Sequence, residues 1–106
     1  MDNRVVGVET PIYARAAAFR NGETTVVYVC LDLMAVSLRI RRQVVAAVQE
    51  RHPELHESSI IITATHTHSG PSGYSEYFFI NLNGPGYSPV VFQAALDGCV
   101  EATLHA

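Results

Sequence analysis

The chain has 106 residues, a length that suits one small domain rather than two. Its composition, 48% hydrophobic and 16% charged, is typical of a globular protein and excludes an intrinsically disordered one. The net charge of −3 excludes the basic surface on which nucleic-acid binding depends, and no run of about 18 apolar residues predicts a transmembrane segment. No apolar stretch follows the N-terminal residues, so we expect no signal peptide.

The first part of the chain predicts a β-hairpin. Residues 13–19 are small and apolar, and residues 24–33 are rich in β-branched and aromatic side chains. Between them, Asn21-Gly22 suits the positive φ angles of a type I′ turn. The later half of the second strand is apolar on both faces. That pattern predicts a central strand covered on both sides.

A helix and a further strand follow the hairpin. Ser37 is a suitable N-cap, the apolar spacing after it is helical, and Pro53 should end the helix at the preceding residue. Residues 60–65 then form an apolar strand. Strand, helix and strand in this order predict a βαβ unit with two parallel strands. Asp32 and His66 would both leave the carboxyl edge of the sheet, where α/β proteins usually bind ligands.

The last segment combines aromatic residues with an apolar helix. Four aromatic side chains follow a glycine-containing loop: Tyr74, Tyr77, Phe78 and Phe79. They either line a substrate groove or pack into the core. Ser88 and Pro89 predict the start of a helix that runs to about Leu104. Its polar residues form one narrow stripe, so the helix needs burial on more than one side, by further domain residues or by self-association.

Two histidines separated by one residue follow the strand predicted at residues 60–65. If the backbone stays extended through Thr67, His66 and His68 project to one face, roughly 6 to 7 Å apart. Neutral imidazole is a common metal ligand and titrates near neutral pH, so one ring could bind a metal while the other handles a proton. Zinc needs three or four protein ligands, however, and solvated loop histidines explain the same pattern. The pair alone leaves both interpretations open.

The segment at residues 63–75, Thr-Ala-Thr-His-Thr-His-Ser-Gly-Pro-Ser-Gly-Tyr-Ser, resembles the signature of neutral ceramidases, the neutral/alkaline non-lysosomal type. In that signature Thr-His-Thr-His-Ser-Gly-Pro-Gly-Gly follows a strand. The resemblance extends, in the same order, to Ala-Arg-Ala at residues 14–16, Leu-Asp-Leu at residues 31–33 and the Asp97-Gly98 pair. It therefore covers nearly the whole chain. One departure is Ser72, where the family usually has glycine.

The predicted elements, a β-hairpin, a βαβ unit and a C-terminal helix, make an α/β fold. The resemblance implies that residues 1–106 are a single partial domain of a larger α/β catalytic domain. It implies a zinc-dependent amide hydrolase that converts ceramide and water into sphingosine and a fatty acid. His66 would be a zinc ligand, and His68 a catalytic residue beside the metal that orients water or stabilises the developing oxyanion. The family's other zinc ligands lie far downstream, so the chain would be an incomplete and inactive fragment on its own.

Two further expectations concern Asp32 and the substrate, the first from the position of Asp32 at a strand end and the second from the resemblance. Asp32, at a strand end, would accept a hydrogen bond from His66, because a carboxylate is a usual partner of a metal-bound histidine. The substrate would be a ceramide-like lipid. Family members are commonly secreted or membrane-associated, which assigns no compartment to a chain without a visible signal peptide.

Two other functions remain as alternatives. One is a different metal-dependent hydrolase that uses His-x-His. A metallo-β-lactamase-like site is disfavoured because Ser69-Gly70 stands where Asp-His is expected, and an amidohydrolase-like site because a hairpin and a βαβ unit come before or around the motif. The other alternative is a non-catalytic α/β interaction module in which the motif is vestigial.

Overall fold

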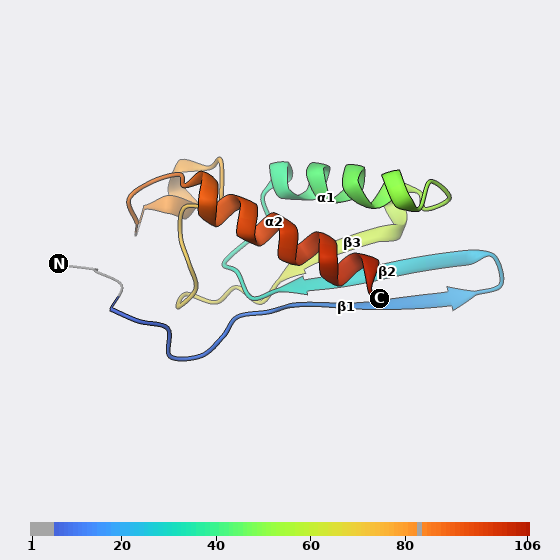
Figure 1. Ribbon diagram of the computed structural model, residues 1–106, viewed down its shortest axis with the longest axis horizontal. Coiled ribbons are helices and arrows are strands. Elements are labelled where there is room, and N and C mark those ends of the chain that lie inside the picture. The colour runs from blue at the N-terminus through green and yellow to red at the C-terminus, as the bar shows by residue number, and fades with distance from the viewer. Residues whose placement is uncertain (1–5, 83) are drawn as a thin grey trace.

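The computed structural model describes residues 6–82 and 84–106 (Figure 1). Its helices and strands are β1 (Ala14–Asn21), β2 (Thr24–Leu31), α1 (Leu38–Arg51), β3 (Ile60–Ala64) and α2 (Pro89–Leu104), with short 3-10 turns at Glu57–Ser59 and Phe78–Asn81. This order confirms the α/β class, with a hairpin, a βαβ unit and a C-terminal helix.

The hairpin is confirmed, but its turn differs from the prediction. Strands β1 and β2 pair antiparallel, and Asn21 is the Cα partner of Thr24. Gly22 and Glu23 therefore form the loop, and Gly22 has a φ of 61°. A type I′ turn at Asn21-Gly22 is wrong, because Asn21 belongs to the strand and does not take a positive φ. A positive φ at the first loop residue alone suits a type II′ turn.

The βαβ unit forms as predicted. Strand β3 pairs parallel to β2, from Val27 opposite Ile60 to Leu31 opposite Ala64, which gives the sheet order β1-β2-β3. Helix α1 begins after Ser37, whose side chain accepts a hydrogen bond from the N–H of Ile40, and it ends at Arg51, two residues before the proline. The local capping signals therefore determine both ends of the helix.

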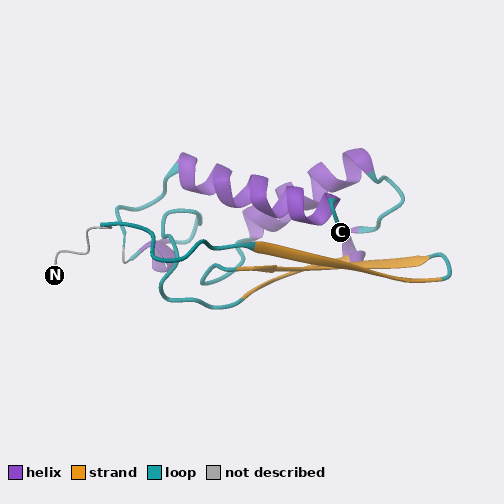
Figure 2. Cartoon of the chain, turned by 60° about the horizontal axis from the view of Figure 1, so that its bottom comes forward, coloured by secondary structure: helices purple, strands orange, loops and turns teal. Residues whose placement is uncertain are grey.

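Both helices lie on the same face of the sheet (Figure 2). Alternate strand residues face them and form the core with apolar side chains of both helices, because successive strand residues point to opposite faces. The core residues include Val27, Val29, Leu31 and Ile60 from the strands, Ile40, Val44 and Val48 from α1, and Phe92, Leu96 and Cys99 from α2. Helix α2 also packs against α1.

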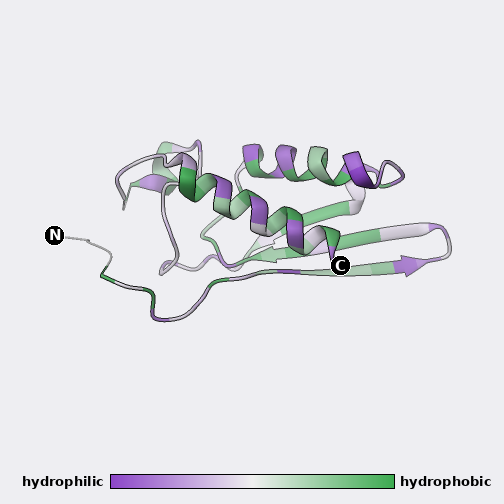
Figure 3. Ribbon diagram, viewed as in Figure 1, coloured by the Kyte–Doolittle hydropathy of each residue, from purple (hydrophilic) through white to green (hydrophobic). Residues whose placement is uncertain are grey.

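The opposite face of the sheet is open within the part of the chain that the structure describes. Phe19, Tyr28 and Ile61 project there and are 64%, 42% and 44% exposed. The hydrophobic colouring of β2 away from the hairpin turn in Figure 3 agrees with its two-sided apolar sequence. The prediction that β2 is covered on both sides is wrong for the described residues, because α1 and α2 share one face.

Helix α2 is buried along one side. Phe92, Leu96 and Cys99 face the core, whereas the polar residues Gln93, Asp97 and Glu101 form an exposed stripe. Val90, near its start, is 79% exposed. In the described residues, neither helix combines the length and the hydropathy required to cross a membrane.

Candidate functional site

The candidate site lies where β2 and β3 end at the same edge of the sheet. Leu31 and Ala64 are the last paired residues of the two strands. Beyond them, the N–H of Thr65 donates to the carbonyl oxygen of Leu31 at 2.9 Å, and the N–H of His66 donates to that of Leu33 at 3.1 Å. These two bonds hold the start of the loop at residues 66–74, named here the histidine loop, against the segment that leaves β2.

His66 has a left-handed backbone, with a φ of 62°. The condition of an extended backbone through Thr67 is therefore not met, because β3 ends at Ala64 and the chain turns at His66. A left-handed non-glycine residue costs about 1–2 kcal/mol. It persists where surrounding bonds determine the conformation. At His66 both the main chain and the ring are held by such bonds.

The ring of His66 is oriented by a main-chain carbonyl. Its Nδ1 atom lies 2.7 Å from the carbonyl oxygen of Met34. A carbonyl oxygen only accepts, so Nδ1 must carry the proton and donate it. In a neutral imidazole this leaves Nε2 unprotonated, with its lone pair available to a metal ion.

His68 lies beside His66. The two ring centroids are 4.9 Å apart, with the rings edge to face at 75°, and both residues are exposed. The structure thus brings the two predicted site residues together, although by a turn of the backbone and not by the alternation of an extended strand. Two exposed imidazoles at this distance can act on one ligand or one reacting group.

Asp32 does not hold His66. Its Oδ2 atom accepts hydrogen bonds from the main-chain N–H of Tyr13 and from Nη1 of Arg15, each at 3.0 Å. The Tyr13 N–H and then Arg15 lower the pKa of the Asp32 carboxyl, because both favour its ionised form. The predicted bond between Asp32 and His66 is therefore wrong. Asp32 ties the start of β1 to the end of β2, and Met34 supplies the acceptor for the imidazole.

Tyr74 anchors the far end of the histidine loop. Its side chain is fully buried, and burial raises the pKa of its phenol. The neutral hydroxyl donates to the carbonyl oxygen of Ala35 and accepts from the N–H of the same residue, both at 3.0 Å. Of the two roles expected for the aromatic stretch, Tyr74 takes core packing, whereas Tyr77, Phe78 and Phe79 are exposed.

The rest of the loop is fixed by polar side chains and close packing. Asn81 accepts from the N–H of Gly73 at 3.0 Å and donates to the carbonyl oxygen of Ser75 at 2.7 Å. A Cβ atom added to Gly84 would collide with the side chain of Ser72. Ser72, where the resemblance leads us to expect glycine, therefore packs closely against Gly84.

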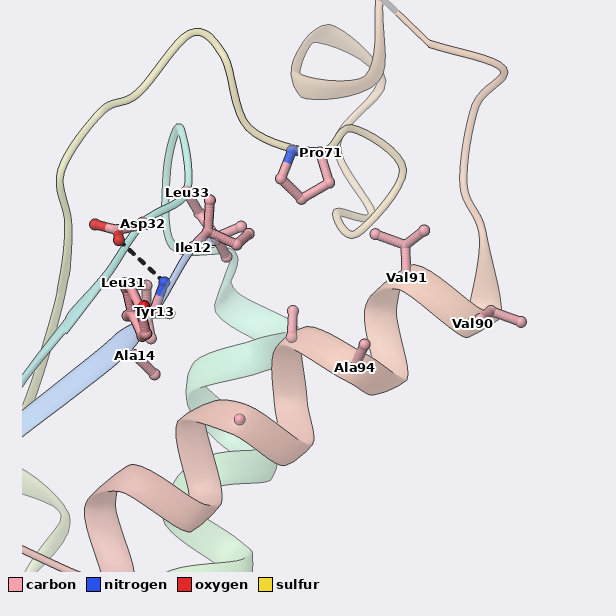
Figure 4. Close-up of a pocket in the computed structure, with 12 residues that line it drawn as sticks. Ile12, Tyr13, Ala14, Leu31, Asp32, Leu33, Pro71, Val90, Val91 and Ala94 are labelled. Carbon is pink, nitrogen blue, oxygen red and sulfur yellow. Dashed lines mark hydrogen bonds between the residues drawn. The ribbon is translucent and has the colours of Figure 1, made fainter. Parts of the chain in front are cut away.

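An apolar groove of about 370 Å³ lies next to the site. Figure 4 shows Ile12 and Leu33 on one side of it, Val91 and Ala94 of α2 on the other, and Pro71 above. Asp32 stands at its edge, bonded to Tyr13 as described. Neither histidine lines the groove, but Pro71 belongs to the same loop as both.

The histidine pair supplies at most part of a metal site. Within residues 6–82 and 84–106, no three His, Cys, Asp or Glu side chains are grouped so that they could hold a metal ion. Sequence reasoning missed the Met34 carbonyl and the partners of Tyr74. A main-chain acceptor has no signal in the residue types, since every residue carries a carbonyl group.

Comparison with known proteins gives consistent matches over this chain. The family model described as neutral/alkaline non-lysosomal ceramidase, N-terminal, matches residues 1–106. The neutral ceramidase of Mycobacterium tuberculosis is 32% identical over 110 residues, which cover 99% of this chain and 17% of that protein. The neutral ceramidase of Pseudomonas aeruginosa is 30% identical over 105 residues, which cover 96% of this chain and 16% of that protein.

A solved structure shares the fold. The crystal structure of neutral ceramidase from Pseudomonas aeruginosa matches with a TM-score of 0.76 and 32% identity, over 87% of this chain and 16% of that chain. The 106 residues thus span 17% and 16% of the two relatives in sequence. The similarity covers the hairpin, the βαβ unit and the histidine loop as parts of one arrangement, and does not rest on the short motif alone.

Proposed function

Because this chain belongs to the neutral/alkaline non-lysosomal ceramidase family, we propose that it takes part in the hydrolysis of a ceramide-like lipid. In this reaction water adds to the amide carbonyl carbon and the C–N bond breaks. The fatty acid leaves with the water oxygen, and sphingosine leaves after its nitrogen takes a proton. The relatives' name, neutral ceramidase, and the match along the whole chain support this proposal.

We assign His66 as a zinc ligand through Nε2. The observation that carries this assignment is the 2.7 Å contact between its Nδ1 atom and the Met34 carbonyl oxygen. Metal-binding histidines almost always donate their other ring N–H to a carboxylate, a carbonyl or water, and this bond orients the ring. Bound zinc supplies Lewis acidity, which polarises an amide carbonyl and favours the ionisation of water.

His68 is the proposed catalytic residue. Its ring lies 4.9 Å from that of His66, centroid to centroid, and is exposed to an incoming substrate. An imidazole in this position can accept a hydrogen bond from the attacking water or donate one to the developing oxyanion. The adjacent apolar groove is the chemical environment that an acyl or sphingoid chain requires.

The remaining zinc ligands would come from outside these 106 residues. His66 is a single ligand, whereas zinc needs three or four protein ligands. We therefore propose that the isolated chain does not hydrolyse ceramide. A titration of the isolated chain that gave tight zinc binding at one ion per chain would contradict this part of the proposal, because a complete site would then exist locally.

A chimeric enzyme tests the function. This enzyme, the chimera, carries this chain in place of the matching region of the Pseudomonas aeruginosa neutral ceramidase. We expect the chimera to bind zinc and hydrolyse ceramide. His66→Ala should lose zinc and activity together, whereas His68→Ala should keep zinc and lose most of its turnover. Metal analysis and ceramide turnover are measured on the same samples.

The control is His56→Ala, which removes an exposed imidazole from the turn before β3, where it contacts Ser58. It should leave zinc content and turnover unchanged. A folded chimera that keeps its zinc after His66→Ala would overturn the ligand assignment. A chimera that cleaves other acyl amides or phosphoesters but not ceramide would favour another metal-dependent hydrolase.

A further inference from the structure

The histidine loop binds three consecutive residues of the segment that leaves β2. The N–H of His66 donates to Leu33, its Nδ1 atom contacts the carbonyl oxygen of Met34, and the hydroxyl of Tyr74 bonds both main-chain groups of Ala35. The two ends of one loop, eight residues apart, therefore hold the same short segment from two sides.

A single peptide group connects Tyr74 to His66. The N–H of Ala35 and the C=O of Met34 belong to the same planar amide and point in opposite directions. Tyr74 Oη accepts from that N–H at 3.0 Å, and the carbonyl oxygen accepts from His66 Nδ1 at 2.7 Å. A hydrogen bond at one end of an amide polarises it and strengthens the bond at the other end. Any rotation of this peptide plane would move the acceptor away from the imidazole.

The burial of Tyr74 makes this connection rigid. The side chain is 0% exposed, and its hydroxyl also donates to the carbonyl oxygen of Ala35 at 3.0 Å. Two bonds of opposite direction to one residue fix the hydroxyl relative to the Met34–Ala35 peptide. The exposed ring of His66, by contrast, has no packing of comparable depth to hold it.

We propose that Tyr74 is a positioning residue for His66. Through the Met34–Ala35 peptide it holds the imidazole in the tautomer that carries its proton on Nδ1 and leaves Nε2 free for a metal ion. The consequence for metal binding rests on the proposed function, whereas the effect on the tautomer does not. The two parts can therefore fail separately.

The first test measures the tautomer of neutral His66 by ¹⁵N NMR of the metal-free chain. The wild-type ring should carry its proton on Nδ1. Tyr74→Phe keeps the buried ring and removes both hydroxyl bonds, so His66 should populate both tautomers. Thr103→Val is the matched control, because it removes another buried hydroxyl, which donates to the carbonyl oxygen of Cys99 at 2.6 Å within α2.

The control separates positioning from stability. Both variants should unfold at lower temperature, but only Tyr74→Phe should change the His66 tautomer. If Tyr74 were merely structural, the tautomer would stay the same in both folded variants, and the inference would be overturned.

The second test measures zinc affinity by titration of the chimera. It decides the role of Tyr74 if Tyr74→Phe unfolds the 106-residue chain. Loss of a partner that orients a metal ligand typically weakens metal binding by about 10–100-fold. We expect such a loss for Tyr74→Phe and none for Thr103→Val. Unchanged affinity in a folded Tyr74→Phe chimera overturns the inference. If the chimera without any substitution binds no zinc, the proposed function is refuted instead. The tautomer measurement then decides the role of Tyr74.

Discussion

The left-handed backbone of His66 brings the two histidines of the motif to one place. Its φ of 62° is the one positive value among the non-glycine residues that the structure describes. The bonds from its N–H to Leu33 and from its ring to Met34 offset the cost of this conformation. Strain at a single residue therefore coincides with the predicted ligand, as is common where a site must be preorganised.

Replacement of His66 by glycine and by alanine should reveal this strain. Both variants lose the imidazole, but only alanine keeps the Cβ atom that disfavours a left-handed backbone. We expect His66→Gly to be more stable than His66→Ala by about 0.5–1 kcal/mol, after allowance for the greater freedom of glycine in the unfolded chain. Urea denaturation measures the difference. Arg42, on the exposed side of α1, is the control: there the alanine replacement should be more stable than the glycine replacement.

The carboxylate of Asp32 should make stability depend on acid. The Tyr13 N–H and Arg15 hold its pKa in the folded chain below the ordinary value of 3.8. Its stabilising effect is thus fully present above about pH 4 and disappears as the pH falls through the lower folded value. Asp32→Asn should be less stable than wild type at pH 7, and the difference should shrink in acid. Urea midpoints of wild type and Asp32→Asn, at pH 7 and below about pH 4, measure this difference in stability.

Arg15→Gln provides a graded comparison for Asp32. It removes the second donor and leaves the Tyr13 N–H, so it should reduce the acid dependence only in part. Equal acid dependence in wild type and Asp32→Asn would show that this carboxylate contributes nothing.

At the scale of single elements, the two helices differ in how their first turns are capped. Ser37 is fully buried and its Oγ accepts from the N–H of Ile40 at 3.2 Å. Ser88 makes the equivalent bond to Val91 at 3.5 Å, and Pro89 follows it. Because proline already sets the φ of the first helical residue, α2 depends less on its cap.

Removal of the caps should therefore have unequal effects. Ser37→Ala should lower the free energy of unfolding by about 1 kcal/mol, the usual cost of a lost N-cap. Ser88→Ala should cost less, because its bond is longer. Chemical denaturation of the two variants gives the comparison directly. A larger loss at Ser88 would mean that the first turn of α2 depends on its cap more than the bond length indicates.

At the scale of the whole molecule, the sheet has one covered and one open face. Ile60 and Ile61 are neighbours in β3, and their side chains lie on opposite faces of the sheet. Ile60 is 1% exposed and contacts the core, whereas Ile61 is 44% exposed beside Tyr28.

This pair tests the one-sided arrangement. Ile60→Ala should cost about 2–5 kcal/mol, the range for a truncated core residue. Ile61→Ala should cost less than about 1 kcal/mol, because a half-exposed side chain on an open face loses little packing. Equilibrium unfolding at several protein concentrations measures both. If Ile61→Ala lowered the free energy of unfolding as much as Ile60→Ala, and if this loss changed with protein concentration, a second copy would cover the open face in solution.

Much of the fold could be predicted because its signals are local. Ser37 and Pro53 bound α1, Ser88 and Pro89 start α2, and the β-branched and aromatic residues that follow Asn21-Gly22 mark the hairpin. The position of the turn could not be predicted, because Asn21 and Gly22 both tolerate a positive φ and the strand register decides which of them lies in the loop.

The candidate site could also be predicted only in part. Residue types and spacing alone identified His66 and His68 as a pair and placed them at the end of a parallel strand. The tertiary structure decided how they meet, because the bond to Met34 joins residues 32 apart and the bonds of Tyr74 to Ala35 join residues 39 apart. Main-chain groups are the same in every residue, so no sequence pattern could show that Met34 and not Asp32 would hold the imidazole.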